Sequence, residues 1–500
     1  MFSLGEILDS FFDVVADAAD GALAIFVGGG FAIEGFHEGV GEEAVGLLTT
    51  LEGILPHSLP LASPSGLCHA KATPLFPQLG VRRSQIRNGH EGLCAILSGT
   101  GLPPHYNETT LYIHAFQCKV YLPMIDRPFW KSRLDRAWSQ VPLVWLAGVR
   151  RAGKTVLSRE LGDAEFLNCD LPHDVARLAD PEAFFRSLKK PLVILDEVHQ
   201  LSDPSRVLKI ATDVFPHLRV LATGSSTLAA TRKFRDTLTG RKRSVVLAPV
   251  LAEELPAFGV TDLNDRLLRG GLPPALLAKE PNWEFYAEWL DSYFARDVQE
   301  MFRVEKRSAF LLLVELVLRQ SGGLLEVTSL AKHAGVSRPT VMNWMEVLQA
   351  THVAHLLRPF SGGGRRELIS RPKLYGFDTG FVCHARGWDK LRPEDCGLLW
   401  EHLVLDTLMA TPVQKVHFWR DASGREVDFV VPRAGGRVDA IECKWNAEAF
   451  DTNALRIFRE AYPDGRNLVL CPHVMTAYER QMGGLKIEFL PISELRQAVS

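Results

Sequence analysis

One segment of the sequence reads Gly148-Val149-Arg150-Arg151-Ala152-Gly153-Lys154-Thr155, directly after the short apolar run Leu143–Ala147. It satisfies the pattern GxxxxGK[ST], and a helix-length segment follows it. In that context the glycines let backbone N–H groups turn inward and cradle phosphates at a helix N-terminus. Lys154 is then expected to reach the β- and γ-phosphates of a nucleotide, and the Thr155 hydroxyl to bind Mg²⁺. The segment predicts an ATP·Mg²⁺ site formed by Gly148, Arg150, Arg151, Ala152, Gly153, Lys154 and Thr155.

About forty residues further on, a second apolar run ends in two acids, Asp196 and Glu197. Alone, an acidic pair at the end of a strand is a common solvated terminus. After a phosphate-binding loop at this spacing it is typical of a Walker B motif. We expect Asp196 to contribute to the Mg²⁺ shell and Glu197 to polarise the attacking water.

The next apolar run ends in Leu221-Ala222-Thr223-Gly224-Ser225. A polar side chain beside the γ-phosphate is expected there, and Thr223 or Ser225 fits that role. A simple helix cap is the competing interpretation of either residue. Further on, Arg241 is a candidate finger for the γ-phosphate of a neighbouring subunit. Alternatively, Arg241 belongs to a solvated basic run that ends at Arg243.

From Phe129 onward, strand-length apolar runs alternate with helix-length segments. Such alternation predicts an α/β fold with a parallel sheet. The predicted strands are Leu143–Ala147, Pro191–Asp196, Arg219–Thr223 and Arg243–Leu247, and further helices span about Asp262 to Phe302. A second α/β region follows Gly362, with strands near Lys373–Phe377, His417–Arg420, Glu426–Val431, Ala440–Cys443 and Asn467–Leu470.

The motifs GVRRAGKT, VILDEVHQL, ATGSSTL, LTGR, GGLPP and YFARD occur in this order. Together they resemble the prokaryotic AAA+ ATPases that carry a C-terminal domain of unknown function, and the resemblance covers Met124 to about Ser500. It implies an AAA+ P-loop core (124–255), a helical lid (256–305), a winged helix (306–360) and a tail like the PD-(D/E)XK restriction nucleases (361–500). Because AAA+ proteins usually complete their sites between subunits, it also implies a homo-oligomer.

Residues 327–349 have the spacing of a helix-turn-helix. Val327–Ala334 is the predicted first helix, and Arg338–Gln349 is the second, with Ser337 as its N-cap. The predicted inward face consists of Leu330, Val341, Trp344 and Leu348. In a DNA-binding version Arg338, Thr340 and Asn343 would face the groove. Since the second helix carries only one basic residue, packing against a protein is the alternative.

The tail holds a pattern of acids and one lysine. Asp428 lies in the middle of a predicted strand, and Glu442 and Lys444 follow on another, on one face by strand alternation. This layout resembles the PD-(D/E)XK core, and Glu401 on the predicted amphipathic helix Leu398–Leu408 matches the extra helical acid of many such enzymes. The resemblance implies that Asp428 and Glu442 share Mg²⁺ and that Lys444 orients water. A buried ion cluster without catalysis is the alternative.

The first 123 residues differ from the rest. They carry 5 basic and 12 acidic side chains, whereas residues 124–500 carry 51 basic and 47 acidic ones. Beyond one expected amphipathic helix at Phe2–Ala19 they show little periodicity. We interpret them as a poorly structured extension that results from a start assigned upstream of Met124.

Composition narrows the class of protein. The chain has 46% hydrophobic and 23% charged residues, as ordinary globular proteins do. No apolar run reaches the roughly 18 residues of a membrane helix. The eight cysteines are scattered without a CxxC pair, which favours reduced thiols and a cytoplasmic location.

Two functions remain open from the sequence. The first is an ATPase whose nucleotide state repositions C-terminal domains that act on nucleic acid, DNA more readily than RNA. The second is an ATP-dependent switch that binds a protein partner and carries an inactive tail.

Overall fold

The computed structural model describes residues 125–224, 238–299, 302, 304–361, 371–412 and 415–500, together with the backbone of β1 (Leu23–Val27) and β2 (Gly30–Glu34). The chain divides into two units, residues 1–121 and 122–500. In the first unit, β1 and β2 pair antiparallel. The predicted helix Phe2–Ala19 and the predicted start at Met124 lie outside the described residues.

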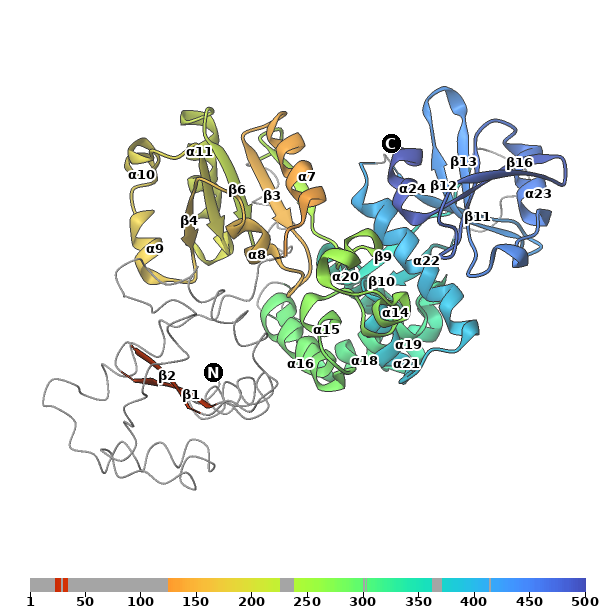
Figure 1. Cartoon of the computed structure of the whole chain (residues 1–500), viewed down its shortest axis with the longest axis horizontal. Helices are drawn as coiled ribbons and strands as arrows, with labels where there is room; N and C mark the ends of the chain where they lie inside the picture. The colour runs from red at the N-terminus through yellow and green to blue at the C-terminus, as the bar shows by residue number, and fades with distance from the viewer. Residues whose placement is uncertain are drawn as a thin grey trace, which may run out of the picture. The chain divides into compact units, whose positions relative to one another are not determined.

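Five parallel strands form the first large sheet of the second unit (Figure 1). In sheet order they are β4 (Ala164–Asn168), β5 (Leu192–Asp196), β6 (Arg219–Thr223), β3 (Leu143–Ala147) and β7 (Lys242–Val246). Four of these strands were predicted within one residue. The sequence analysis missed β4, because only Leu167 of this edge strand is buried and its apolar pattern is weak.

Side chains on both faces of this sheet are buried. On β3, Val144 and Leu146 pack into one core cluster, whereas Leu143, Trp145 and Ala147 pack into another. Burial on both faces explains why the parallel strands are continuously apolar rather than alternating. The helices of this region are α7 (Pro128–Trp138), α8 (Lys154–Arg159), α9 (Pro172–Arg177), α10 (Pro181–Ser187) and α11 (Pro204–Val214), with a 3₁₀ turn η1 (Val198–Gln200).

A group of short helices follows the sheet. They are η2 (Ala252–Phe258), α14 (Leu263–Arg269), α15 (Pro273–Leu276), α16 (Trp283–Tyr293) and the π-helical segment η3 (Phe294–Gln299). They confirm the helices expected between Asp262 and Phe302. The Gly270-Gly271 turn is tightly packed, since a Cβ on Gly271 would stand 2.5 Å from Nη2 of Arg266.

The predicted helix-turn-helix is present, with α19 at Val327–Ala334 and α20 at Arg338–Ala350. Ser337 caps α20 by accepting a hydrogen bond from the Thr340 N–H, and Gly335 adopts the left-handed conformation (φ 64°) that ends α19. The helix α18 (Arg307–Arg319) precedes them. The strands β8 (Gly323–Leu324), β10 (Lys373–Gly376) and β9 (Ala354–Leu357) form a small antiparallel sheet in that order.

One expected strand belongs to a different sheet. The sequence analysis placed Lys373–Phe377 in the second α/β region, but β10 pairs with β8 and β9 instead. The segment between β9 and β10 is long enough for the chain to reverse direction, so β10 pairs antiparallel with β9.

The second α/β region contains a mixed six-stranded sheet. Its order is β11 (His417–Arg420), β12 (Glu426–Pro432), β13 (Val438–Cys443), β14 (Asn467–Leu470), β16 (Leu485–Leu490) and β15 (Tyr478–Met482). β13 and β14 are parallel, as are β14 and β16, and the other neighbours are antiparallel. The helices are α21 (Thr379–Arg386), α22 (Pro393–Ala410), α23 (Asn453–Ala461) and α24 (Ile492–Val499), with short turns η4 (Ala434–Gly436) and η5 (Ala447–Ala449).

The helix predicted as amphipathic at Leu398–Leu408 is the core of α22. It is buried on nearly every side, including His402 and Thr407, because α14, α21, α24 and β13 pack around it. A helix enclosed in this way carries no apolar stripe in its sequence.

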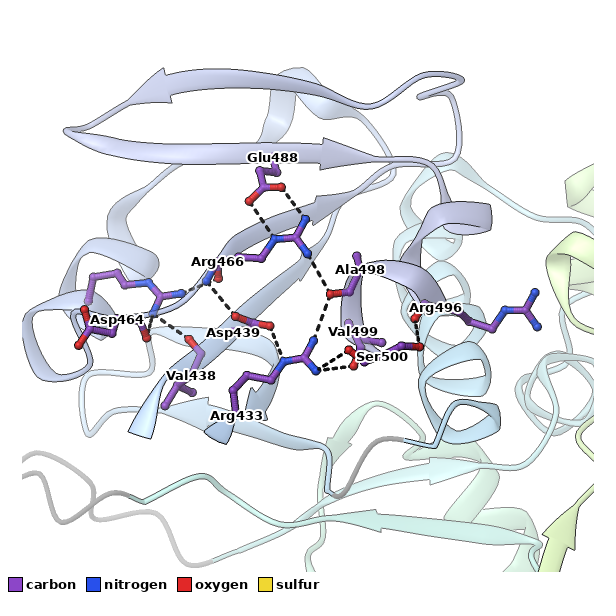
Figure 2. A network of polar contacts seen from close by, with 11 residues as sticks. Arg433, Val438, Asp439, Asp464, Arg466, Glu488, Arg496, Ala498, Val499 and Ser500 are labelled. Atoms are coloured by element: carbon purple, nitrogen blue, oxygen red, sulfur yellow. Dashed lines mark hydrogen bonds and ion pairs between the residues drawn. The ribbon is translucent and has the colours of Figure 1, made fainter. Parts of the chain in front are cut away.

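Two arginines fasten the last helix to the six-stranded sheet (Figure 2). Arg433 donates to Asp439 at 2.7 Å and to the Ala498 carbonyl at 3.1 Å. Arg466 donates to the same carbonyl at 2.9 Å and forms a two-pronged ion pair with Glu488. Since the last carbonyls of a helix have no partner within it, these contacts satisfy the end of α24.

The cysteines of the described part, Cys169, Cys383, Cys396, Cys443 and Cys471, are buried free thiols. Among the described residues, no helix has the length and apolar character to cross a membrane.

Candidate nucleotide site

The phosphate-binding loop joins β3 to α8, and its geometry explains both glycines. Gly148 has φ +139°, and a Cβ there would stand 2.6 Å from the Leu247 carbonyl oxygen. Gly153 has φ +98° directly before the first residue of α8. Both conformations are rare for residues with a side chain. The loop therefore delivers the chain to a helix N-terminus, which favours anions.

Lys154 folds back over the loop. Its ammonium donates to the carbonyl oxygens of Gly148 at 3.0 Å and Val149 at 3.1 Å. Burial lowers the pKa of Lys154, while the nearby carboxylates Glu197 and Asp297 oppose that shift. A cation held inside the loop is placed to neutralise phosphate charge.

Asp196 binds two hydroxyl groups at the carboxyl edge of the sheet. Thr155 donates to Asp196 Oδ2 at 2.9 Å, and Thr223 donates to Asp196 Oδ1. Burial raises the pKa of Asp196, although the hydrogen bonds from Thr223 and Thr155 work against this. The Thr223 hydroxyl also accepts from the backbone N–H of Glu197 at 3.1 Å, so one buried side chain holds both acids in place.

The donor set fits a magnesium ion. Mg²⁺ in phosphate sites is held by one or two protein oxygens together with substrate phosphates and water, so few protein ligands are needed. The Thr155 hydroxyl and the Asp196 carboxylate provide that pair within 2.9 Å of each other. A bound Mg²⁺ would neutralise charge on the β- and γ-phosphates.

Glu197 adopts a strained left-handed conformation, with φ 52° and ψ 44°. Non-glycine residues in that region are uncommon and cluster at functional sites. The His199 ring lies 3.3 Å from the Glu197 carboxylate. Burial favours the neutral acid, but the His199 hydrogen bond and the charge of Lys154 outweigh it, so the pKa of Glu197 lies below its ordinary value. Glu197 is therefore ionised and able to accept a proton.

A pocket of about 960 Å³ extends from the loop to α15, α16 and η3, which belong to the predicted lid. Arg150 of the loop pairs with Asp297 of η3 at 3.2 Å, and its carbonyl accepts from the Trp289 indole N–H at 3.1 Å. Arg151 lies over the Phe285 ring, 5.2 Å from its centre. The predicted loop arginines thus contact the lid.

Several pocket residues were not predicted. Arg127 is buried and makes two 2.8 Å bonds to Glu254, while a third donor reaches the Ala152 carbonyl at 3.1 Å. Arg296 and Thr351 also line the pocket. The only local signal was the motif YFARD, which contains Arg296. Arg127 and Thr351 reach the pocket only through contacts distant in sequence.

The remaining nucleotide-site candidates lie elsewhere. Arg241 directly precedes β7, whose first residue pairs with the first residue of β3, so it lies at the amino ends of these strands, whereas the phosphate loop follows the carboxyl end of β3. It forms a 2.7 Å ion pair with Asp213. From that position it is far from the loop of its own chain. Ser225 lies outside the described residues.

The helix-turn-helix face is also formed as predicted. Leu330, Val341, Trp344 and Leu348 are buried, whereas Arg338 and Asn343 are exposed and Thr340 is half-buried. Met342 is 46% exposed on the same helix.

The four tail candidates come together, and each of the three acids lies beside a lysine. Lys444 lies 2.7 Å from Glu442 and 3.7 Å from Asp428. Glu401 instead pairs at 2.7 Å with Lys373 of β10, a residue that the sequence analysis did not consider. In the part of the chain that is described, no three acidic, histidine or cysteine side chains are grouped to hold a metal. The two acids that were predicted to share Mg²⁺, Asp428 and Glu442, both lie beside the Lys444 ammonium.

Comparison with known proteins shows which protein families the chain matches. The model of a family described as an AAA domain matches residues 140–255, and two families described as domains of unknown function match residues 260–392 and 396–495. The uncharacterised protein Rv2008c of Mycobacterium tuberculosis is 30% identical over 339 residues, which cover 65% of this chain and 75% of that protein. The uncharacterised protein Mb2031c of Mycobacterium bovis matches to the same extent. The chain belongs to their family.

This family member carries a P-loop ATPase domain, since the AAA match contains the phosphate loop, Asp196 and Glu197. The AAA domain makes it an ATP-binding protein of the ATPase class. Its function beyond that class is not given by the two mycobacterial relatives.

Some solved structures are similar at a lower level. A RuvB variant from Thermotoga maritima is 18% identical and covers 47% of this chain and 90% of its own, with a TM-score of 0.25. A DNA replication initiation factor is 14% identical over 44% of this chain and 85% of its own, with a TM-score of 0.21. Scores this low support no argument about function.

Proposed function

We propose that this protein binds ATP·Mg²⁺ at the loop Gly148–Thr155, hydrolyses it with Glu197 and uses the nucleotide state to reposition the helix-turn-helix. Lys154 and the N-terminus of α8 bind the phosphates, Thr155 and Asp196 hold Mg²⁺, and Glu197 accepts the proton of the attacking water. Thr223 orients both acids through its hydroxyl.

The observation that carries this proposal is the extent of the pocket. Its lining includes Lys154 and Glu197 from the ATPase core, Asp297 from η3, and Thr351 and Val353 directly after α20. The Thr351 hydroxyl lies 2.7 Å from that of Tyr293, which precedes η3. A ligand that alters the fit between core and lid therefore acts directly on the end of α20.

Apolar side chains in the lining of the pocket suit the base of the nucleotide. Ile125, Phe258, Pro273 and Leu277 are among the lining residues, and Leu277 is 49% exposed. Covering such a surface with a flat ring is favourable because apolar area leaves water.

Nucleic acid is the first candidate partner of the helix-turn-helix. The order α18, β8, α19, α20, β9, β10 supports a winged helix, and Arg338 and Asn343 are exposed at the start of α20. A protein partner is the second candidate, favoured by the exposed Met342 and Glu346 on that helix. An apolar side chain beside an acid suits a protein surface better than phosphates.

Hydrogen exchange tests the coupling. In the Glu197→Gln chain, ATP is expected to slow amide exchange at residues 347–355 relative to ADP. Lys154→Ala should abolish the difference by weakening nucleotide binding. Protection confined to the phosphate loop, with no change at residues 347–355, would refute coupling while leaving the ATP site intact.

A further inference from the structure

Lys373 occupies the centre of the acidic cluster in the tail. It lies on β10 and is 4% exposed. Its ammonium is 2.7 Å from Glu401 on α22 and 2.6 Å from Glu426 on β12. Tyr375, two residues further on the same face of β10, also donates to Glu401. One lysine thus satisfies two carboxylates from different elements.

The other half of the cluster is equally occupied. The register pairs Phe429 with Ile441, which sets Asp428 opposite Glu442 on the next pair of residues. Like charges directly opposite one another are unfavourable. Lys444 bonds Glu442 at 2.7 Å, and the Cys443 N–H donates to Asp428 at 2.8 Å. Arg420 adds a 3.1 Å contact to Glu426.

These contacts leave little room for a divalent cation. A metal bound to Glu401 or Asp428 would need their oxygens within about 2.0–2.6 Å. One oxygen of each is already bound, since Glu401 Oε1 accepts from Lys373 and Tyr375, and Asp428 Oδ2 accepts from the Cys443 N–H. A fixed ammonium in a partly dry site also repels a second cation strongly, because the low dielectric screens it poorly.

Lys373 and its acidic partners lie in regions that two different family models match. Glu401, Glu426, Asp428 and Glu442 all lie within residues 396–495, whereas Lys373 lies within residues 260–392. Its ion pairs therefore join the small sheet β8-β10-β9 to the tail. The spacing of the acids in the sequence therefore could not predict that Lys373 pairs with them.

We propose that Lys373 takes the place that a metal would fill, so that the cluster is a metal-independent ion-pair junction between the helix-turn-helix region and the tail. The nuclease-like pattern is then structural in this protein. The proposal does not depend on ATP hydrolysis.

Manganese counting tests the junction. Mn²⁺ is added to the nucleotide-free full chain, and the Mn²⁺ that stays free is measured by electron paramagnetic resonance. The chains compared are wild type, Asp428→Asn, Lys373→Met and the double variant. Binding at Thr155 and Asp196 is common to all four chains and cancels in the comparison. We expect wild type and Asp428→Asn to bind equal amounts of Mn²⁺. Lys373→Met should gain one ion per chain, and Asp428→Asn in the same chain should remove it.

Two results would overturn the proposal. One is a wild type that binds one Mn²⁺ more than Asp428→Asn, a comparison that needs no lysine variant to fold. The other is a folded Lys373→Met chain that gains no ion. The Lys373→Met chain should unfold at a lower urea concentration than wild type. Adding Glu401→Gln to that chain should restore part of the lost stability. The control Lys486→Met, whose lysine forms an exposed pair with Glu479, should leave the midpoint unchanged.

Discussion

At the scale of single residues, the sequence predicted which side chains meet at the candidate nucleotide site. The spacing of Lys154, Thr155, Asp196 and Glu197 depends on backbone geometry that glycine positions and strand length encode locally. Thr223 and Ser225 were equal candidates, because Thr223 ends the strand and Ser225 follows it two residues later. The structure brings the Thr223 hydroxyl to Asp196 and to the Glu197 N–H. Lys373 escaped prediction, because its carboxylate partners are contacts formed only by the tertiary fold.

Thr223→Val tests the role of that hydroxyl. Asp196 would lose a donor and the Glu197 N–H its acceptor, which should cost about 1–3 kcal/mol of the free energy of unfolding. ATP turnover should fall because Glu197 is no longer oriented. Urea unfolding and phosphate release measure the two effects. Thr407→Val, which removes a buried hydroxyl bonded within α22, should lower stability alone. Unchanged turnover in Thr223→Val would contradict the assignment.

At the scale of elements, strongly marked segments were predicted and weakly marked ones were not. Ser337, Gly335 and the buried face of Leu330 to Leu348 located α19 and α20. The edge strand β4 has one buried residue and gave no signal, and β15 and β16 were also missed. The pairing of β10 with β9 could not be foreseen, since pairing depends on contacts distant in sequence.

The packing of α22 predicts sensitivity to acid. His402 is buried on α22 with its Nε2 2.9 Å from the Ser321 hydroxyl. Burial, with the charge of Arg386, lowers the pKa of His402 to about 3 from its ordinary 6.5. The unfolded chain therefore binds the proton more readily, so this stability is present above pH 6.5 and is lost as pH falls toward 3. Below about pH 6 the loss is roughly 1.4 kcal/mol per pH unit for this one group.

Urea midpoints between pH 7.5 and 5 check this expectation. His402→Gln should flatten the decline relative to wild type, although the half-buried His352 and His355 contribute a decline of their own, since desolvation lowers the pKa of each to about 4. His333→Gln on the exposed face of α19 is the matched control. An equal slope in His402→Gln and wild type would count against a neutral buried His402.

At the scale of the whole molecule, the position of Arg241 makes a prediction about assembly. It lies at the amino end of β7, whereas its own phosphate loop follows the carboxyl end of β3, so we predict that it serves a neighbouring chain. Arg241→Ala and Glu197→Gln should each abolish turnover. In a mixture of the two variants, the Arg241→Ala chain keeps its Glu197 and should receive Arg241 from a neighbouring Glu197→Gln chain.

Phosphate release from that mixture, followed against protein concentration, tests the idea. We expect activity well above the average of the two variants, rising as the chains associate. A mixture that shows only the average activity would exclude Arg241 as a finger supplied by another chain.

The central claim is hydrolysis at Glu197, and ATP turnover by wild type and Glu197→Gln tests it most directly. The substitution keeps the shape and the loop contacts but removes the proton acceptor, so turnover should fall by about 100-fold or more while ATP stays bound. Glu182→Gln, which changes an exposed glutamate on α10, is the control and should match wild type. A wild type without turnover, or a Glu197→Gln chain that hydrolyses ATP at the wild-type rate, would contradict the account.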